Sequence, residues 1–107
     1  MSKYRAVKTV VDGIKFDSKK EAARYCELKL LVKADVIRDL RLQVPFEIVP
    51  SVVIGGRKQR AVMYKADFVY TENGEQVVED TKGMRTAEYV IKRKLMKHVH
   101  GIEIKET

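Results

Sequence analysis

The stretch AVMYKADFVYTENGEQVVEDTK, residues 61–82, decides the fold. Residues 61–70 alternate apolar and polar side chains, which is the period of a half-buried strand. One face of this strand then carries Val62, Tyr64, Ala66, Phe68 and Tyr70. Residues 72–75 are typical of a turn, so residues 76–82 form the partner strand of a hairpin. Asp67 therefore points to the face opposite the apolar side chains.

The residues before this hairpin predict a smaller hairpin and a helix. Residues 7–16 contain two short apolar runs around Asp12-Gly13, a dipeptide suited to a tight type I′ turn. Ser18 with Glu21 three residues later forms a capping-box pattern, and the following residues are good helix formers without glycine or proline. We expect a helix over residues 19–33.

A third strand is expected between this helix and the hairpin. Residues 36–49 carry apolar side chains at even spacing from Leu40 onward, which predicts an extended segment, bent near Pro45. Gly55-Gly56 and the basic residues around them predict a turn.

The end of the chain predicts a second helix and a last strand. Gly83 breaks the hairpin strand, Thr86 is suited to cap a helix over residues 87–99, and Gly101 ends that helix before a strand at residues 102–105. The order is a hairpin, a helix, three strands, a helix and a strand. We therefore expect one α/β domain over residues 1–107, with a mixed central sheet.

The charge of the chain indicates a polyanionic partner. Its 22 Lys and Arg exceed 15 Asp and Glu, for a formal net charge of +7, and nucleic acid is the usual partner of so basic a chain. The charge is clustered at residues 3–8, 57–65 and 92–97, and residues 51–66 contain no acid. A lysine-rich surface that serves only solubility, and an acidic protein partner, are the alternatives.

The composition does not fit a membrane protein, a disulfide-bonded protein or a zinc protein. The apolar runs are far shorter than the roughly 20 residues that cross a bilayer, so no membrane association is expected, and the protein should be soluble and intracellular. Cys26, the one cysteine, cannot form an internal disulfide. We expect it to be buried in the first helix. His98 and His100 lack the cysteine pair of a zinc site, so zinc is not expected.

Three polar residues of the hairpin form a candidate site. Asp80 and Lys82 are two residues apart on one strand and project from the same face, and Asp67 on the other strand can face Asp80. Two converging carboxylates form the hard oxygen site that Mg²⁺ or Mn²⁺ prefers. In the alternative, Asp67 and Lys82 form a cross-strand ion pair and Asp80 is solvated.

Two further acids are ambiguous. Glu21 is explained either as the third helical residue of a capping box or as an acid heading the inward face of the helix, where it can join the metal site. Glu79 alternates away from Asp80 and is expected to be solvated or paired rather than catalytic.

At these residues the sequence resembles the PD-(D/E)XK nuclease superfamily, which includes archaeal Holliday-junction resolvases, and more narrowly a family of small phage-encoded nucleases. The stretches that carry the resemblance are FDSKKE at residues 16–21, YKADF at residues 64–68 and VEDTKG at residues 78–83. Ala66 stands where the superfamily has its proline. The resemblance covers almost the whole chain and implies a restriction-endonuclease-like fold.

The resemblance also implies an activity. Glu21, Asp67, Asp80 and Lys82 correspond to the catalytic residues, and the metal ligands would be Glu21, Asp67, Asp80 and Thr81. The implied cofactor is Mg²⁺, for which Mn²⁺ would substitute, and the implied reaction is the hydrolysis of DNA phosphodiester bonds, selective for branched DNA. The second helix would contact phosphates.

The resemblance further implies a cytoplasmic location in a bacterial host cell. It leaves room for a homodimer, because duplex or junction cleavage needs two cuts and one such site makes one. The alternative function is a non-catalytic nucleic-acid-binding module of the same fold.

Overall fold

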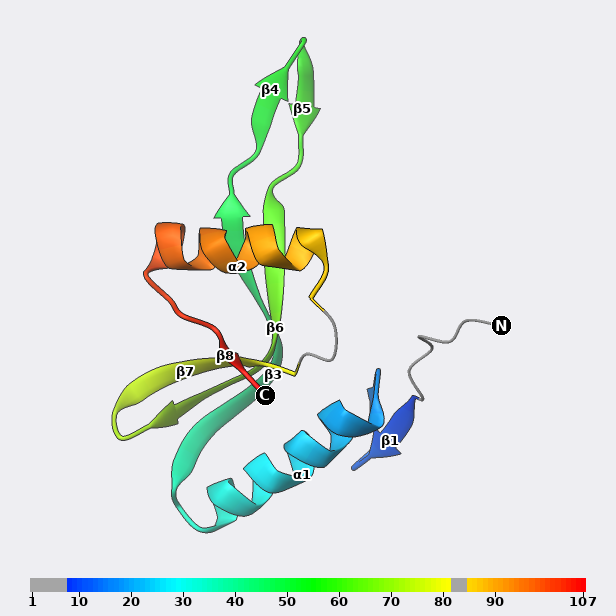
Figure 1. The fold of residues 1–107 in the computed structure, drawn as a ribbon, viewed down its shortest axis with the longest axis vertical. Helices are drawn as coiled ribbons and strands as arrows, with labels where there is room; N and C mark the ends of the chain where they lie inside the picture. The colour runs from blue at the N-terminus through cyan, green and yellow to red at the C-terminus, as the bar shows by residue number, and fades with distance from the viewer. Residues whose placement is uncertain (1–7, 82–84) are drawn as a thin grey trace.

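The computed structural model describes residues 8–81 and 85–107 (Figure 1). Lys82, a predicted site residue, lies outside these ranges. The described residues form one small mixed α/β domain with two helices and a mixed four-stranded sheet, as the sequence predicted. No helix within these residues has the length and apolar character needed to span a membrane.

The central sheet has the strand order β3-β6-β7-β8. Its strands are β3 (Ile37–Val49), β6 (Val62–Glu72), β7 (Glu75–Asp80) and β8 (Lys105–Glu106). The first three pair antiparallel, whereas β8 pairs parallel to β7. A parallel pair needs a crossover connection, and helix α2 (Ala87–His100) supplies it. The last strand is shorter and begins later than residues 102–105, where it was expected.

Both helices have the local signals that the sequence suggested. Helix α1 spans Lys19–Lys33, and the Ser18 hydroxyl accepts a hydrogen bond from the Glu21 backbone N–H at 3.1 Å. The Thr86 hydroxyl does the same for the Tyr89 N–H, and Gly101 ends α2 in the left-handed conformation with φ of 69°. The expectation for Cys26 was wrong, because this side chain is exposed on the outer face of α1.

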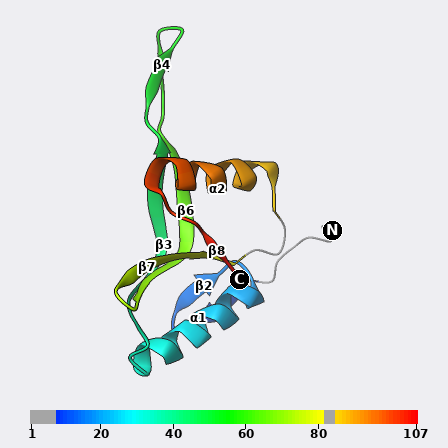
Figure 2. The same cartoon turned by 60° about the vertical axis from the view of Figure 1, so that its left-hand side comes forward.

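Two short hairpins extend from the ends of these elements. Strands β1 (Thr9–Val11) and β2 (Ile14–Phe16) turn at Asp12-Gly13, whose φ angles of 52° and 75° are those of the predicted type I′ turn. Strands β4 (Val52–Ile54) and β5 (Arg57–Gln59) form a second hairpin where the sequence predicted only a turn. Figures 1 and 2 show this hairpin continuing the β3 and β6 ribbon beyond α2.

The apolar interior consists of two clusters, one under each helix. Tyr64 and Ala66 belong to the cluster of α2, whereas Phe68 and Tyr70 belong to the cluster of α1. The expectation that alternating β6 side chains share one environment was therefore wrong. The paired strand β3 changes cluster at the same level, because Leu42 belongs to the α1 cluster and Val44 to the α2 cluster. Gln43 between them has a φ of 53°, outside the extended region that regular alternation requires.

Candidate functional site

A pocket of about 590 Å³ lies where the first turns of α1 and α2 approach strands β6 and β7. On β6, the lining residue Asp67 lies between Ala66 of the α2 cluster and Phe68 of the α1 cluster. Three of the predicted site acids, Glu21, Asp67 and Asp80, line it together with Thr81. The other lining residues are Asp17, Ser18, Lys20, Tyr64, Lys65, Thr86, Glu88, Tyr89 and Lys92.

Asp67 and Asp80 come together through the register of the β6 and β7 hairpin. The last paired residues are Phe68 and Glu79, so Asp67 and Asp80 occupy the next facing positions. The Asp67 carboxylate accepts a hydrogen bond from the Thr81 backbone N–H at 2.9 Å. Asp80 is 3% exposed, so the alternative in which it is solvated is wrong.

The carboxylate of Asp67 has an unusually high proton affinity. Burial is the main cause of a pKa raised from 3.8 to about 7, and the Asp80 and Glu21 carboxylates add to it, while the Thr81 N–H opposes it. Burial and the two neighbouring carboxylates disfavour the negative charge of Asp67, whereas the Thr81 N–H favours it. The pocket thus holds Asp67 in surroundings that disfavour its negative charge.

Glu21 approaches this pair through a residue that the sequence analysis did not select. Gln43 Nε2 donates to Glu21 Oε2 at 3.3 Å and to Asp67 Oδ1 at 3.5 Å. The Glu21 backbone serves the helix cap while its buried carboxylate lines the pocket, so its two proposed roles are compatible. In the sequence, Gln43 falls on the polar side of the alternation in residues 40–48, so no signal distinguished it from the other polar residues of this strand.

Two tyrosines also line the pocket, of which Tyr64 was missed and Tyr89 was expected beside the site as part of the basic second helix. Tyr64 donates its hydroxyl to Asp80 Oδ2 at 2.5 Å, and burial together with this carboxylate raises the pKa of the phenol. Tyr89 donates to Glu106 Oε2 at 2.6 Å, which joins α2 to β8 beside the pocket. In the sequence Tyr64 resembles an ordinary core residue, and the hydroxyl partners of both tyrosines appear only in the fold.

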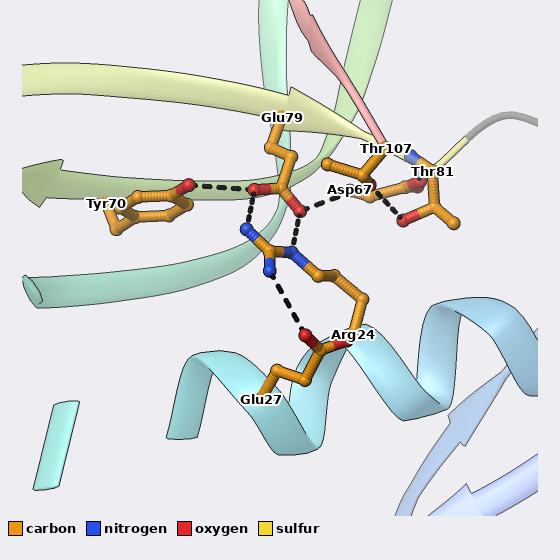
Figure 3. Close-up of polar contacts among 7 residues, drawn as sticks. All are labelled: Arg24, Glu27, Asp67, Tyr70, Glu79, Thr81 and Thr107. Atoms are coloured by element: carbon orange, nitrogen blue, oxygen red, sulfur yellow. Dashed lines mark hydrogen bonds and ion pairs between the residues drawn. The ribbon is translucent and has the colours of Figure 1, made fainter. Parts of the chain in front are cut away.

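Glu79, next to Asp80 on β7, lies in a different environment (Figure 3). It is fully buried, and Arg24 on α1 donates to its two carboxylate oxygens at 2.7 and 2.9 Å. Tyr70 donates a third hydrogen bond at 2.7 Å. Burial alone would raise the pKa of Glu79, but these donors outweigh it and lower the pKa. The expectation that Glu79 is paired is confirmed.

A chain of polar contacts leads from this ion pair to the pocket. The Thr107 hydroxyl donates to Glu79 at 3.4 Å and lies 3.4 Å from the Thr81 hydroxyl. Thr81 in turn holds Asp67 through its backbone N–H, and Figure 3 shows the whole chain. The pair also ties α1 to β7 one helical turn after Glu21, so it helps to hold Glu21 near Asp67.

Basic side chains surround the acids of the pocket. Lys20 on α1, Lys65 on β6 and Lys92 on α2 line it. Lys92 forms an ion pair with Glu88 at 2.9 Å, on the same helix. The pocket therefore presents acids at its floor and cations from three elements, a combination suited to a metal ion and a phosphate.

The acids alone do not form a complete metal cluster. Within residues 8–81 and 85–107, no group of three or more Asp, Glu, His or Cys side chains is arranged to hold a metal ion. Asp67 and Asp80 nevertheless form a facing carboxylate pair, and oxygen donors of this kind fit Mg²⁺ or Mn²⁺. A divalent cation would offset both the burial and the neighbouring carboxylates that raise the Asp67 pKa.

Comparison with known proteins places the chain in a family. It belongs to the family described as "Protein of unknown function (DUF1064)", whose model matches residues 1–107. No curated protein and no solved structure matches the chain.

Proposed function

We propose that this protein is a metal-dependent nuclease that hydrolyses phosphodiester bonds in DNA. The observation that carries the proposal is the facing pair Asp67 and Asp80 in a pocket lined by Lys20, Lys65 and Lys92. A carboxylate with a raised pKa beside a second carboxylate is typical of functional sites, because structural acids are normally given a counter-charge. The resemblance to PD-(D/E)XK nucleases, and with it a restriction-endonuclease-like fold, is part of the proposal.

The metal site would use the acids of the pocket. Asp67 and Asp80 are the two carboxylates that would hold Mg²⁺ or Mn²⁺, with Glu21 and Thr81 beside them. The ion, when bound, would supply Lewis acidity and lower the pKa of a water. Tyr64 supports this role, since its hydroxyl donates to one carboxylate oxygen of Asp80 and holds that side chain in place.

The basic residues of the pocket would bind the substrate. Lys65 on β6 and Lys92 on α2 line the same pocket from different elements and can neutralise phosphates next to the scissile bond. Lys82 would orient the attacking water, and this assignment rests on the resemblance. A preference for branched DNA rests on the resemblance as well.

Cleavage assays with an isosteric variant test the proposal. Labelled four-way junction, flap, linear duplex and single-stranded DNA are incubated with wild type, Asp80→Asn and Glu75→Gln, in Mg²⁺, Mn²⁺ or EDTA. Asp80→Asn keeps an acceptor for Tyr64 but removes the charge. Glu75→Gln removes the same charge at the exposed start of the same strand.

The nuclease predicts cleavage that needs metal, persists in Glu75→Gln and falls to background in Asp80→Asn, with circular dichroism showing both variants folded. Binding without cleavage in every metal would instead support the non-catalytic module. Cleavage retained in Asp80→Asn would reject the assignment of the site.

A further inference from the structure

The β4 and β5 hairpin, residues 52–59, stands apart from the two apolar clusters. Figures 1 and 2 show it extending beyond α2. Within the described residues, its strands pair with each other and pack extensively against no other element. A two-stranded hairpin is marginally stable in water when nothing covers it. We refer to residues 52–60, the hairpin and Arg60, as the arm.

The two strands of the arm differ in chemistry. Strand β4 is wholly apolar, and Val53 and Ile54 are 70% and 64% exposed. Strand β5 is Arg-Lys-Gln and is followed by Arg60. The register pairs Val53 with Lys58 and Ile54 with Arg57, so the two levels next to the turn each have an apolar edge and a cationic edge.

Among the described residues, the cations of the arm, Arg57, Lys58 and Arg60, form no ion pair with an acid. Residues 51–66 contain no Asp or Glu. Gly55 and Gly56 have φ of 57° and 77°, which allows the tight turn and keeps the tip free of side chains. The tip is therefore narrow.

We propose that the arm binds double-helical nucleic acid by lying in its major groove. That groove admits a two-stranded β-ribbon, whereas the minor groove is too narrow without deformation. The edge formed by Arg57, Lys58 and Arg60 would lie along phosphates, and the Val53 and Ile54 edge would contact base edges such as thymine methyl groups. Charge complementarity favours this partner over a second copy of the same basic chain.

The position of the arm limits how far from the pocket it can contact a duplex. Strand β5 leads directly into β6, on which Lys65 lines the pocket. Gly56 is nine residues before Lys65, a span of at most about 30 Å in extended chain, or about 9 base pairs of duplex. The arm would thus contact duplex to one side of the bond cleaved in the pocket, and in this respect the inference rests on the proposed function.

Binding measurements in EDTA test the arm without requiring cleavage. Fluorescence anisotropy compares a duplex of about 30 base pairs with one of about 6 base pairs over a range of salt concentrations. The arm variant is Arg57→Gln, Lys58→Gln and Arg60→Gln together. The matched control, Lys15→Gln, Lys29→Gln and Lys33→Gln, removes the same charge from exposed residues of β2 and α1.

We expect the arm variant to bind the long duplex about 10- to 100-fold more weakly, with a salt slope reduced by about 2.7, since each phosphate contact contributes about 0.9. The control should lose less affinity and little slope. On the short duplex the two variants should be equal. Equal losses on the long duplex would overturn the proposal, because they would show an effect of net charge alone.

A deletion separates the arm from its alternatives. Val49 pairs with Val62, so replacing residues 50–61 by Asn-Gly closes the ribbon with a two-residue turn. The shortened protein should lose affinity for the long duplex. Unchanged affinity, or conversion of a dimer to a monomer that still binds duplex normally, would overturn the inference. Binding through the arm without any cleavage would reject the proposed nuclease activity but not the proposed role of the arm. Cleavage unaffected by the deletion would reject the role of the arm but not the nuclease activity.

Discussion

Glu79 and Asp67 are carboxylates on neighbouring strands, and their surroundings differ in burial and in the groups that donate to them. Glu79 is completely buried with Arg24 and Tyr70 on its oxygens, and its pKa is lowered. Asp67 is half-buried, its donors are a backbone N–H and the Gln43 amide, and its pKa is raised to about 7. No ion pair among the described residues involves Asp67.

The comparison separates a structural acid from a candidate functional acid. A buried charge is stable when the fold supplies its counter-charge, as Arg24 does for Glu79. Asp67 keeps its negative charge near neutral pH only at a cost, and it does so in an open pocket beside Asp80. A cation from solution would remove that cost, which is why the second environment suits a metal ion.

The largest expected effect is on the Arg24 and Glu79 pair. Arg24→Met leaves the Glu79 carboxylate buried without its counter-charge, so the free energy of unfolding should fall by about 3 to 5 kcal/mol in urea denaturation at pH 7. The added change Glu79→Gln should recover part of this loss, because it removes the buried charge but keeps an acceptor for Tyr70.

Glu27→Gln is the matched control for this prediction. Glu27 also pairs with Arg24, at 3.6 Å, but its side chain is 64% exposed. A surface pair of this kind contributes about 0 to 1 kcal/mol. Similar losses in Arg24→Met and Glu27→Gln would mean that the buried pair does not hold the fold in the way described.

Removal of the Asp67 charge in the pocket is expected to stabilise the fold, by less than removal of Arg24 destabilises it. Because the folded-state pKa of Asp67 is above its ordinary value, the contribution of this group to stability is fully present below about pH 4 and is lost as the pH rises through about 7. Such a shift corresponds to at most about 4 kcal/mol, and solvent around the half-buried group reduces it to about 1 to 2 kcal/mol.

Asp67→Asn should therefore raise Tm at pH 8 in EDTA by about 5 to 10 °C and have little effect at pH 4. The variant keeps an acceptor for the Thr81 N–H. A lower Tm for Asp67→Asn at pH 8 would show that its charge stabilises the fold, as that of Glu79 does, and the contrast between the two acids would be lost.

The smallest expected effect is stabilisation by the metal. At Mg²⁺ concentrations about ten times its Kd, the gain at pH 8 is about 1.4 kcal/mol. Thermal denaturation with and without Mg²⁺ should show this gain in wild type and in Glu75→Gln, but not in Asp67→Asn. An equal Mg²⁺ effect in all three proteins would place the ion outside the pocket.

Much of the fold could be predicted because its signals are local. The bounds of α1 follow from the Ser18 cap and the helix formers after it, and the β1 and β2 hairpin follows from Asp12-Gly13. The prediction failed where a residue departed from the expected backbone, as at Gln43, or where strands were too short to show a period, as in the arm.

The site could be predicted in part for a similar reason. Asp67 and Asp80 followed from strand alternation and one hairpin, which involve neighbouring segments. Gln43 and the role of Arg24 could not be predicted, because Gln43 is 24 residues from Asp67 and Arg24 is 55 residues from Glu79. No local pattern relates residues so far apart.

The sequence by itself determined the order of the elements, most of their bounds, the basic character of the chain and the acids that face one another across the β6 and β7 hairpin. Those features depend on caps, turns and periodicity within a few residues. Only the tertiary structure decided that Glu79 pairs with Arg24, that no described residue forms an ion pair with Asp67, and that the arm stands free of the core. The reason is that desolvation and counter-charge depend on which distant segments the fold brings together.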